Sequence, residues 1–270
     1  MAPEKPSVLV TGASSGIGAC TAAHLKQVGF EVFGTSRRPE RLPEGAPDIR
    51  WIALDVCDDE SVAKGVGQVL AAVPRLDAVV CNAGFGIFGS VEEVSMEAAR
   101  AQLETNFFGC LRTLRAVIPP MRNAGRGRIA LVGSLAGRAP IPFQAHYSAS
   151  KAAVDALALS LRNELHGSGV SVSLIEPGDI ATPFNDAMRW DESEGSVYGE
   201  RIRTCEAVIR ESLPKAPPPE VVARAVHRAL SERRPRVRYA VGADSTLVPL
   251  GRRLLPDWLT LRLIRSHFRI

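Results

Sequence analysis

Hydrophobic positions along the chain form short, nearly continuous runs that alternate with longer stretches in which apolar residues recur every three or four positions. The short runs are rich in valine, isoleucine and leucine, as the buried strands of a parallel sheet are. The longer stretches have the period of amphipathic helices. The expected strands are 7–11, 30–35, 49–54, 77–81, 128–133, 170–176 and 237–241. The expected helices are 17–28, 59–73, 94–121, 147–166 and 219–232.

This alternation predicts an α/β fold with a doubly wound, Rossmann-type parallel sheet that is covered by helices on both faces. Residues 1–241 form a single domain in this interpretation, and a ligand is expected at the carboxyl ends of its strands. Two segments fall outside the alternation. Residues 183–216 are expected to form a lid over a substrate, and residues 242–270 are a C-terminal extension rich in arginine and leucine.

Composition narrows the classes of function without selecting one. With 46% hydrophobic and 23% charged residues, the chain has the make-up of a soluble globular protein. The net charge of +4 is small, and the arginines of the chain are not interleaved with aromatic residues, so nucleic acid is not an expected partner. Neither a spanning segment nor a signal peptide is recognisable, which makes the cytoplasm the expected location. The five cysteines and five histidines lack the spacing of a disulfide framework or a metal site, so no metal is expected.

A glycine-rich loop follows the first strand, where residues 11–18 read T-G-A-S-S-G-I-G. Glycines let the backbone approach a phosphate closely, and the amide groups at a helix N-terminus attract negative charge. A strand before the loop, a helix after it and a further strand within about thirty residues form the context of a dinucleotide site. Without a ligand, the same pattern would be a plain strand-to-helix turn. The residues expected at the pyrophosphate are Gly12, Ser14, Ser15, Gly16, Ile17 and Gly18.

The end of the second strand indicates which dinucleotide is bound. An NAD site often places a carboxylate there for the ribose hydroxyls, whereas this chain has Arg37 and Arg38. Guanidinium groups match the oxygens of a 2′-phosphate, so NADP(H) is the expected cofactor, and a solvated arginine pair is the alternative. Asp55 and Val56 after the third strand are further expected cofactor contacts. Asp55 would accept from the adenine amino group, unless it only caps the next helix.

Residues 146–151 read H-Y-S-A-S-K, which places Tyr147 and Lys151 four positions apart. On a helix these two side chains share one face. A tyrosine and a lysine at this spacing, with no other motif nearby, more often belong to a surface helix with an extended lysine. The pair therefore points to chemistry only in combination with the other motifs of the chain.

Several further motifs occur in a fixed order: Asn82-Ala83-Gly84 after the fourth strand, Asn106 in the next helix, Ser134 after the fifth strand, and Pro177-Gly178 after the sixth. Together with the glycine loop and the Y-x-x-x-K motif, they make residues 7–241 resemble the short-chain dehydrogenases/reductases in their shorter, non-extended branch. Residues 236–244 and 254–258 are similar to the C-terminus of the retinol and 17β-hydroxysteroid dehydrogenases in that family.

The resemblance implies a role for each of these residues. Tyr147 would transfer the proton while hydride passes between a nicotinamide and the carbonyl carbon. A phenol has a pKa of about 10, and a neighbouring ammonium group lowers that pKa, so Lys151 is expected to activate the tyrosine and also to hold the nicotinamide ribose. Ser134 would bind the substrate oxygen, and Asn106 would support a water in a proton relay. The other implied cofactor contacts are Asn82, Ala83, Gly84, Pro177, Gly178, Ile180 and Thr182.

Aromatic and aliphatic residues near these motifs suggest an apolar substrate pocket. Its expected wall, in addition to Ser134, comprises Phe85, Ile141, Phe143, Phe184 and Met188. The expected function is therefore interconversion of a hydrophobic ketone or aldehyde, of steroid, retinoid or aromatic type, with its alcohol. The alternatives are a 3-ketoacyl-type reductase and a non-catalytic NADP(H)-binding regulator, although a regulator would be expected to have lost the tyrosine, lysine or serine.

Two expectations concern partners. The family resemblance implies a homodimer or homotetramer built on helices 94–121 and 147–166. The extension 242–270 is expected to dock as a helix that covers the sheet edge, and the alternative is a basic amphipathic segment in peripheral contact with a membrane.

Overall fold

The computed structural model describes residues 5–182, 184, 188–190, 196–242 and 244–270, without the side chains of 189 and 190. Its centre is a parallel sheet with the strand order β3-β2-β1-β4-β6-β7-β9. The sheet confirms the expected α/β class and each of the seven expected strands, within a few residues at their ends. The strands are β1 (Ser7–Val10), β2 (Glu31–Ser36), β3 (Arg50–Ala53), β4 (Ala78–Cys81), β6 (Gly127–Val132), β7 (Val170–Pro177) and β9 (Arg238–Val241).

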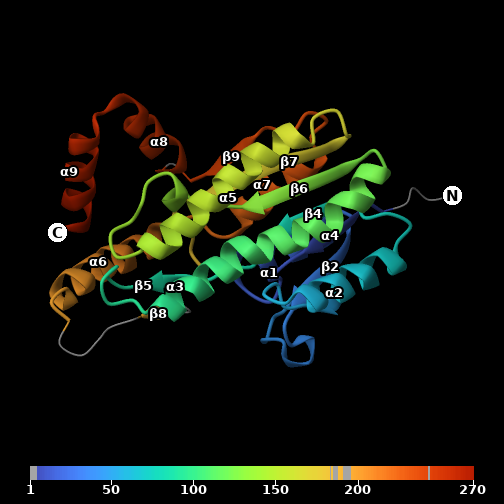
Figure 1. The fold of residues 1–270 in the computed structure, drawn as a ribbon, viewed down its shortest axis with the longest axis horizontal. Helices are drawn as coiled ribbons and strands as arrows, with labels where there is room; N and C mark the ends of the chain where they lie inside the picture. The colour runs from blue at the N-terminus through green and yellow to red at the C-terminus, as the bar shows by residue number, and fades with distance from the viewer. Residues whose placement is uncertain (1–4, 183, 185–187, 191–195, 243) are drawn as a thin grey trace.

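Helices cover both faces of the sheet (Figure 1). On one face, α2 (Asp59–Ala72), α4 (Gly109–Asn123) and α5 (Ala145–Glu164) bury valines, leucines and a methionine against the strands. On the other face, α1 (Gly16–Gln27) and α7 (Glu220–Ser231) bury a second apolar cluster. The central strands are buried on both faces, which is why their sequences are continuous apolar runs.

The strand order reverses its direction at β1. This strand pairs with β2 on one side, where Val10 lies opposite Gly34, and with β4 on the other, where Val10 lies opposite Val80. The loops that leave the carboxyl ends of β1 and β4 therefore separate to opposite sides of the sheet. This crevice is where open α/β sheets bind their ligands, and the glycine loop opens directly into it.

The expected helix 94–121 is interrupted, which corrects the prediction of one continuous helix. It consists of α3 (Met96–Leu103), a π-helical turn η2 (Glu104–Phe108) and α4. In this turn the Gly109 amide donates to the Glu104 carbonyl five residues earlier. Such one-residue insertions occur mostly at functional sites, and this one contains Asn106.

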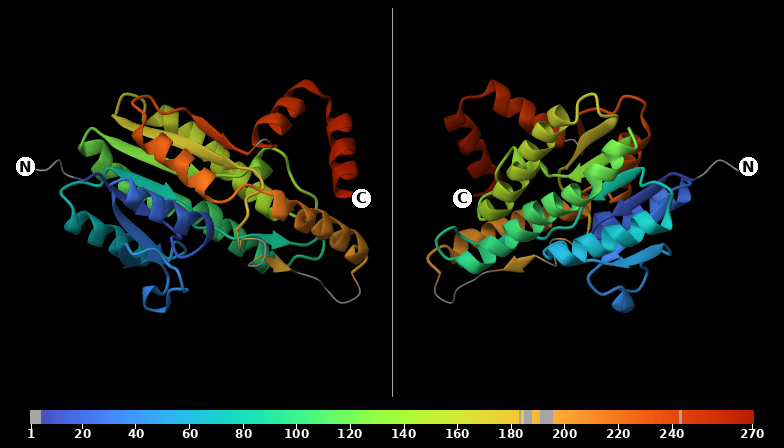
Figure 2. Two further views of the ribbon diagram at one scale, coloured as in Figure 1. Left: turned by 180° about the vertical axis from the view of Figure 1, so that it is seen from behind. Right: turned by 45° about the vertical axis from the view of Figure 1, so that its right-hand side comes forward.

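The lid contains secondary structure that the sequence pattern did not predict, whereas the C-terminal extension is helical, as expected. A short strand β8 (Arg189–Trp190) pairs in parallel with β5 (Ile87–Phe88). A helix α6 (Gly199–Ser212) and a short 3-10 turn η4 (Leu213–Lys215) complete the described part of the lid. The extension forms α8 (Asp244–Leu254) and α9 (Asp257–Phe268), which stand away from the body of the molecule at one end (Figures 1 and 2).

Candidate active site

The glycine loop after β1 adopts a conformation that only glycines tolerate. Gly12 and Gly16 have positive φ angles of 65° and 53°. At Gly18 a Cβ atom would lie 2.1 Å from the Gly12 carbonyl oxygen and 2.4 Å from the Asn82 side-chain nitrogen. The loop and the first turn of α1 are thus packed closely against each other and against Asn82, with no room for a Cβ atom at Gly18.

Two threonines and an asparagine hold this loop in place. The Thr11 hydroxyl accepts from the amides of Asn82 and Ala83, at 2.9 and 3.1 Å. The Asn82 side chain donates to the carbonyls of Thr11 and Gly12, at 3.0 and 3.1 Å, and the Thr35 hydroxyl accepts from the Gly12 amide at 3.2 Å. The structure therefore shows Asn82 and Ala83 as supports of the loop. Thr11 and Thr35 were missed by the sequence reasoning, because a hydroxyl inside a strand run carries no signal of its own.

The N-terminus of α1 has the features of an anion site. Ser15 is its N-cap residue, yet its side chain makes no capping hydrogen bond, and the first turn contains no acidic residue. The amide groups of Gly16, Ile17 and Gly18 therefore have no side-chain acceptor from the cap. Ser14 is partly buried beside them, and Ser15 is exposed. The positive end of the helix dipole thus faces a space that a pyrophosphate suits.

The positions expected to contact the rest of a dinucleotide lie at the adjoining strand ends. Arg37 and Arg38 directly follow β2 and are exposed, and within the described chain neither guanidinium has an ion-pair partner. Asp55 lies beyond β3, and its carboxylate accepts from the Cys57 amide at 2.9 Å. The cap of α2 is Asp58, so Asp55 retains a free carboxylate oxygen. Val56 has its side chain buried under α4, which leaves only its backbone for a ligand.

Tyr147 and Lys151 lie one turn apart at the start of α5, as their spacing predicts. The Lys151 ammonium is buried, 5.8 Å from the centre of the Tyr147 ring, and donates to the Val132 carbonyl at 2.9 Å. Val132 ends β6, and Ser134 follows two residues later. The Ser134 hydroxyl accepts from the Ala136 amide at 3.1 Å and lies close enough to the Tyr147 phenol to stabilise its anion. The fold thus brings Ser134, which follows β6, to the Tyr147–Lys151 pair at the start of α5.

Burial dominates the electrostatics of this group. It raises the pKa of Tyr147 to about 12, an effect that Ser134 only partly offsets. Burial also lowers the pKa of Lys151 to about 8, and the ammonium is engaged by a backbone carbonyl. The lowering of the phenol pKa by Lys151 stays a prediction.

Asn106 supports the loop after β4. Its side-chain oxygen accepts from the Phe85 amide at 3.0 Å, and its nitrogen donates to the Phe85 carbonyl and the Ser150 hydroxyl, both at 3.0 Å. Both N–H donors of this amide are thereby occupied, so a water in a relay could bind the Asn106 side chain only as a donor to its oxygen, or bind its backbone. Gly84 packs closely against this amide, because a Cβ atom at Gly84 would lie 3.0 Å from the Asn106 side-chain oxygen. The buried Gln102 binds Phe85 and Ile87 in the same way and was not predicted.

Residues that were predicted to contact the nicotinamide end of the cofactor lie in the segment after β7. Pro177 ends β7, and the amide of Gly178 donates to the Val241 carbonyl at 2.9 Å. Thr182 approaches the start of α1, since a Cβ on Gly16 would lie 3.8 Å from the Thr182 Cβ. Ile180 differs from the expectation, because its side chain is buried in the core cluster under α1 and α7. Only its backbone remains for a cofactor contact.

An apolar wall lies directly against the phenol. The Phe184 ring is centred 5.6 Å from the Tyr147 ring. Phe184 and Phe143 pack on a cluster formed by Phe88, Met188, Ile202 and Cys205. Phe143 has a φ angle of 60°, an uncommon conformation for a bulky residue that tends to occur at functional sites. Three of the predicted wall residues are thus together.

The other two predicted residues of the apolar wall, Phe85 and Ile141, lie outside this group. Phe85 is half-buried and bound through its backbone by Asn106 and Gln102. Ile141 is half-buried, and its amide donates to the Ser148 hydroxyl at 3.3 Å. Neither side chain belongs to the apolar cluster around Phe88. The structure therefore leaves their contact with a substrate as a prediction.

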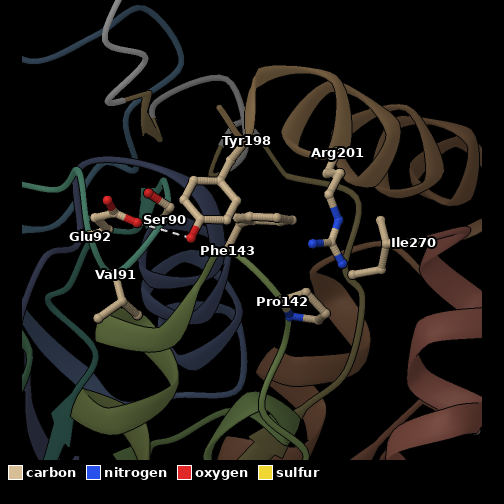
Figure 3. A pocket seen from close by; sticks show the side chains of 8 residues that line it. All are labelled: Ser90, Val91, Glu92, Pro142, Phe143, Tyr198, Arg201 and Ile270. Atoms are coloured by element: carbon tan, nitrogen blue, oxygen red, sulfur yellow. Dashed lines mark hydrogen bonds between the residues drawn. The ribbon is translucent and has the colours of Figure 1, made fainter. Parts of the chain in front are cut away.

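A surface pocket of about 460 Å³ borders the Phe143 ring and is separate from the group of Ser134, Tyr147 and Lys151 (Figure 3). Figure 3 shows Tyr198 beside Phe143, with the Tyr198 hydroxyl donating to Glu92 at 2.9 Å. Arg201 and Ile270 lie on one side of these rings, so the end of the C-terminal extension borders the pocket. None of the residues that line it is Ser134, Tyr147 or Lys151.

Within the described part of the chain, no group of three or more histidine, cysteine, aspartate or glutamate side chains is placed to hold a metal ion. None of the helices described is sufficiently long and apolar to traverse a bilayer.

Comparisons with known proteins agree with this arrangement. The family model of the short chain dehydrogenases matches residues 6–193. The chain is 34% identical to a 3-ketodihydrosphingosine reductase of Bacteroides thetaiotaomicron, over 97% of this chain and 98% of that protein. It is 33% identical to human 17-beta-hydroxysteroid dehydrogenase type 1, over 93% and 81% of the two chains.

Two solved structures extend the likeness to three dimensions. A short-chain dehydrogenase from Streptomyces avermitilis superposes with a TM-score of 0.83 and 30% identity, covering 100% of this chain and 97% of the other. A short chain dehydrogenase from Burkholderia cenocepacia, in complex with NADP, has a TM-score of 0.78 and 27% identity, covering 97% and 99%.

Proposed function

Because this chain belongs to the short-chain dehydrogenase/reductase family, we propose that it interconverts a hydrophobic ketone or aldehyde and its alcohol by hydride transfer with NADP(H). The observation that carries the proposal is the apolar wall against the catalytic phenol, where Phe184 packs on Tyr147. A polar reacting group at Tyr147 and Ser134, bordered by aromatic and aliphatic side chains, suits a substrate with one carbonyl on an apolar body.

The residues at the crevice fit NADP(H). The N-terminus of α1, which has no side-chain cap, suits the pyrophosphate. Arg37 and Arg38 are exposed, have no ion-pair partner among the described residues, and suit a 2′-phosphate. The NADP named for the Burkholderia cenocepacia structure supports the same choice. When bound, the cofactor supplies or accepts the hydride at the carbonyl carbon. Every other function of the site falls to the chain's own side chains.

Tyr147 and Ser134 handle the substrate oxygen in this proposal. With its pKa raised to about 12, the Tyr147 phenol holds its proton at neutral pH and is ready to donate it to the developing alkoxide. The Ser134 hydroxyl lies beside the phenol, so one substrate oxygen can accept hydrogen bonds from both groups.

Of Tyr147 and Lys151, the lysine has the pKa closer to neutral, at about 8. Its ammonium is held at the Val132 carbonyl, one helical turn from Tyr147. In this proposal Lys151 returns a proton to the Tyr147 phenolate and binds the cofactor ribose. Asn106 positions the loop after β4 through the Phe85 backbone. The value of kcat/KM for reduction is then expected to fall as pH rises above about 8, because Lys151 loses its proton there.

The names of two relatives support a large apolar substrate. One is a reductase of 3-ketodihydrosphingosine, and the other is a dehydrogenase of 17-beta-hydroxysteroids. Both names describe a ketone or alcohol carried on a large hydrocarbon body. The Phe88, Met188, Ile202 and Cys205 cluster behind Phe184 offers an apolar surface of the matching kind.

The test is oxidation of NADPH and of NADH, followed by absorbance, with a panel of carbonyl compounds. The panel contains a 3-keto sphingoid base, a 17-keto steroid, retinal, aromatic ketones and an acetoacyl thioester. Turnover of an apolar ketone with NADPH is expected, with a loss of at least about a hundredfold in the Tyr147→Phe variant. Tyr239→Phe is the matched control, because this tyrosine lies in β9 and donates to Glu232.

Three results would contradict the proposal in different ways. Preferential turnover of the thioester would indicate a 3-ketoacyl-type reductase. Tight binding of NADPH without turnover of any panel member would favour a non-catalytic regulator. Activity unchanged in Tyr147→Phe would remove the assigned proton donor.

A further inference from the structure

The C-terminal extension leaves an apolar surface uncovered. Helix α8 turns its Ser245 and Pro249 side towards the body, and these two residues are buried. Helix α9 is attached near its end, where Phe268 packs on the cluster beneath α6. Figures 1 and 2 show that most of this helical hairpin projects beyond the rest of the molecule. The opposite faces of α8 and α9 therefore have no covering element within the described chain.

Large apolar side chains line that uncovered face. Leu247, Leu250 and Leu254 are spaced by three and four residues, which puts them in one stripe along α8, with exposed fractions of 64%, 54% and 73%. Trp258 and Leu261, three residues apart on α9, are 65% and 53% exposed. Isolated exposed leucines need no explanation, but four leucines and a tryptophan on one hairpin, here called the apolar ridge, do.

The same hairpin carries most of the net charge of the protein. Residues 242–270 contain five arginines and two aspartates, a net charge of +3, whereas the whole chain has +4. Arg252 donates to the Arg138 carbonyl, and Arg269 pairs with Glu211 at 2.7 Å. Arg253, Arg262 and Arg265 are exposed and have no ion-pair partner in the described parts of the chain. Free positive charge thus accompanies the apolar ridge.

We propose that the α8–α9 hairpin docks this protein on the surface of a membrane that contains anionic lipids. An apolar ridge with a tryptophan and flanking arginines has the composition of helices that lie in the headgroup region, where tryptophan is enriched. Arginines next to such a ridge add attraction to a negative leaflet. A second copy of the chain fits less well, because two identical hairpins brought face to face would oppose like charges. The docking does not depend on which reaction the protein catalyses.

Flotation of the whole protein with lipid vesicles tests the proposal. Vesicles of phosphatidylcholine are compared with vesicles of phosphatidylcholine and phosphatidylglycerol at low and at high salt. Binding to the anionic vesicles is expected to be at least about tenfold stronger and to weaken with salt. Fluorescence of Trp258 is expected to shift to shorter wavelength in the bound state, since 65% of its surface is exposed in the free protein.

Paired variants separate the apolar from the charged contribution. The double variant Leu254→Ser with Trp258→Ser is expected to lower vesicle binding at least about tenfold. Met96→Ser is its control, because Met96 is 66% exposed but lies on α3, outside the hairpin. A second double variant, Arg262→Gln with Arg265→Gln, is expected to lose about fivefold per arginine, on anionic vesicles only.

Removal of two exposed arginines elsewhere, Arg115→Gln with Arg122→Gln on α4, is the control for charge. Thermal melting in solution shows that each variant is folded. The proposal is overturned if the protein does not float with anionic vesicles, or if the control variants weaken binding as much as the hairpin variants. It is also overturned if sedimentation shows a dimer that Leu254→Ser with Trp258→Ser converts to a monomer, because a second copy then covers the ridge.

Discussion

Replacing Lys151 by methionine is expected to stabilise the folded protein while removing its activity. Burial lowers the pKa of this lysine from 10.5 to about 8, which corresponds to a cost of about 3 kcal/mol for carrying the charge in the folded state. Methionine has a similar length and no charge to desolvate. It also loses the hydrogen bond to the Val132 carbonyl, at a cost of about 1 kcal/mol. The net gain at neutral pH is about 2 kcal/mol, or a few degrees in Tm.

The pH dependence follows from the direction of the pKa change. Below about pH 8 the lysine is charged in both the folded and the unfolded state, so the full cost is present in the wild type. Between about 8 and 10.5 the folded lysine is neutral while the unfolded one stays charged. The unfolded state then binds more protons, the wild type gains stability as pH rises, and the advantage of the variant shrinks.

Chemical denaturation of both proteins without cofactor, at about pH 7 and about pH 10, measures this difference. Lys64→Met is the matched control, because Lys64 is exposed on α2, and its effect is expected to stay within about 0.5 kcal/mol. A Lys151→Met protein that is no more stable than the wild type at neutral pH would refute the reasoning. So would an advantage that is unchanged at high pH.

Three further outcomes are expected. Replacing Arg37 and Arg38 together by alanine should raise the KM for NADPH by about a hundredfold and leave that for NADH nearly unchanged, and equal changes in both would contradict the assigned 2′-phosphate contact. Gly18→Ala places a Cβ 2.1 Å from a backbone oxygen of the glycine loop and should abolish cofactor binding in titrations, whereas Gly67→Ala on α2, which meets nothing within 4 Å, should bind normally and be more stable by up to about 1 kcal/mol. Burial lowers the pKa of His24, so the unfolded state takes up a proton before the folded state as pH falls through about 6.5, and the protein loses stability there. His24→Gln should flatten the dependence of stability on pH in this range, as measured by chemical denaturation. An unchanged slope would contradict this assignment.

The fold could be predicted because its signals are local. Each strand of the sheet is an apolar run between turn residues, and each covering helix repeats its apolar positions at the helical period, so the alternation specified the parallel sheet. The glycine loop was equally readable, since Gly12 and Gly16 need positive φ angles and Gly18 has no room for a Cβ atom. The spacing of Tyr147 and Lys151 placed them on one face of α5.

The π-helical turn at Glu104–Phe108 was not predictable in this way. The apolar period of residues 94–121 continues through it, and the insertion is held by partners outside the helix. Asn106 binds the Phe85 backbone and the Ser150 hydroxyl, which are remote in sequence. Hydrogen bonds of this kind have no periodic signature. The same applies to Thr11 and Thr35, which read as ordinary strand residues but support the glycine loop.

The sequence by itself determined the order of strands and helices, the position of the glycine loop and the chemical groups available for catalysis, because backbone conformation and side-chain type are properties of each residue and its near neighbours. Only the tertiary structure decided how those groups behave. It buried Lys151 against the Val132 carbonyl, and it desolvated Tyr147, which raises the pKa of the phenol. It also packed Phe184 against the phenol and left Leu254 exposed. Desolvation and packing depend on atoms contributed by distant segments, and these come together only when the chain folds.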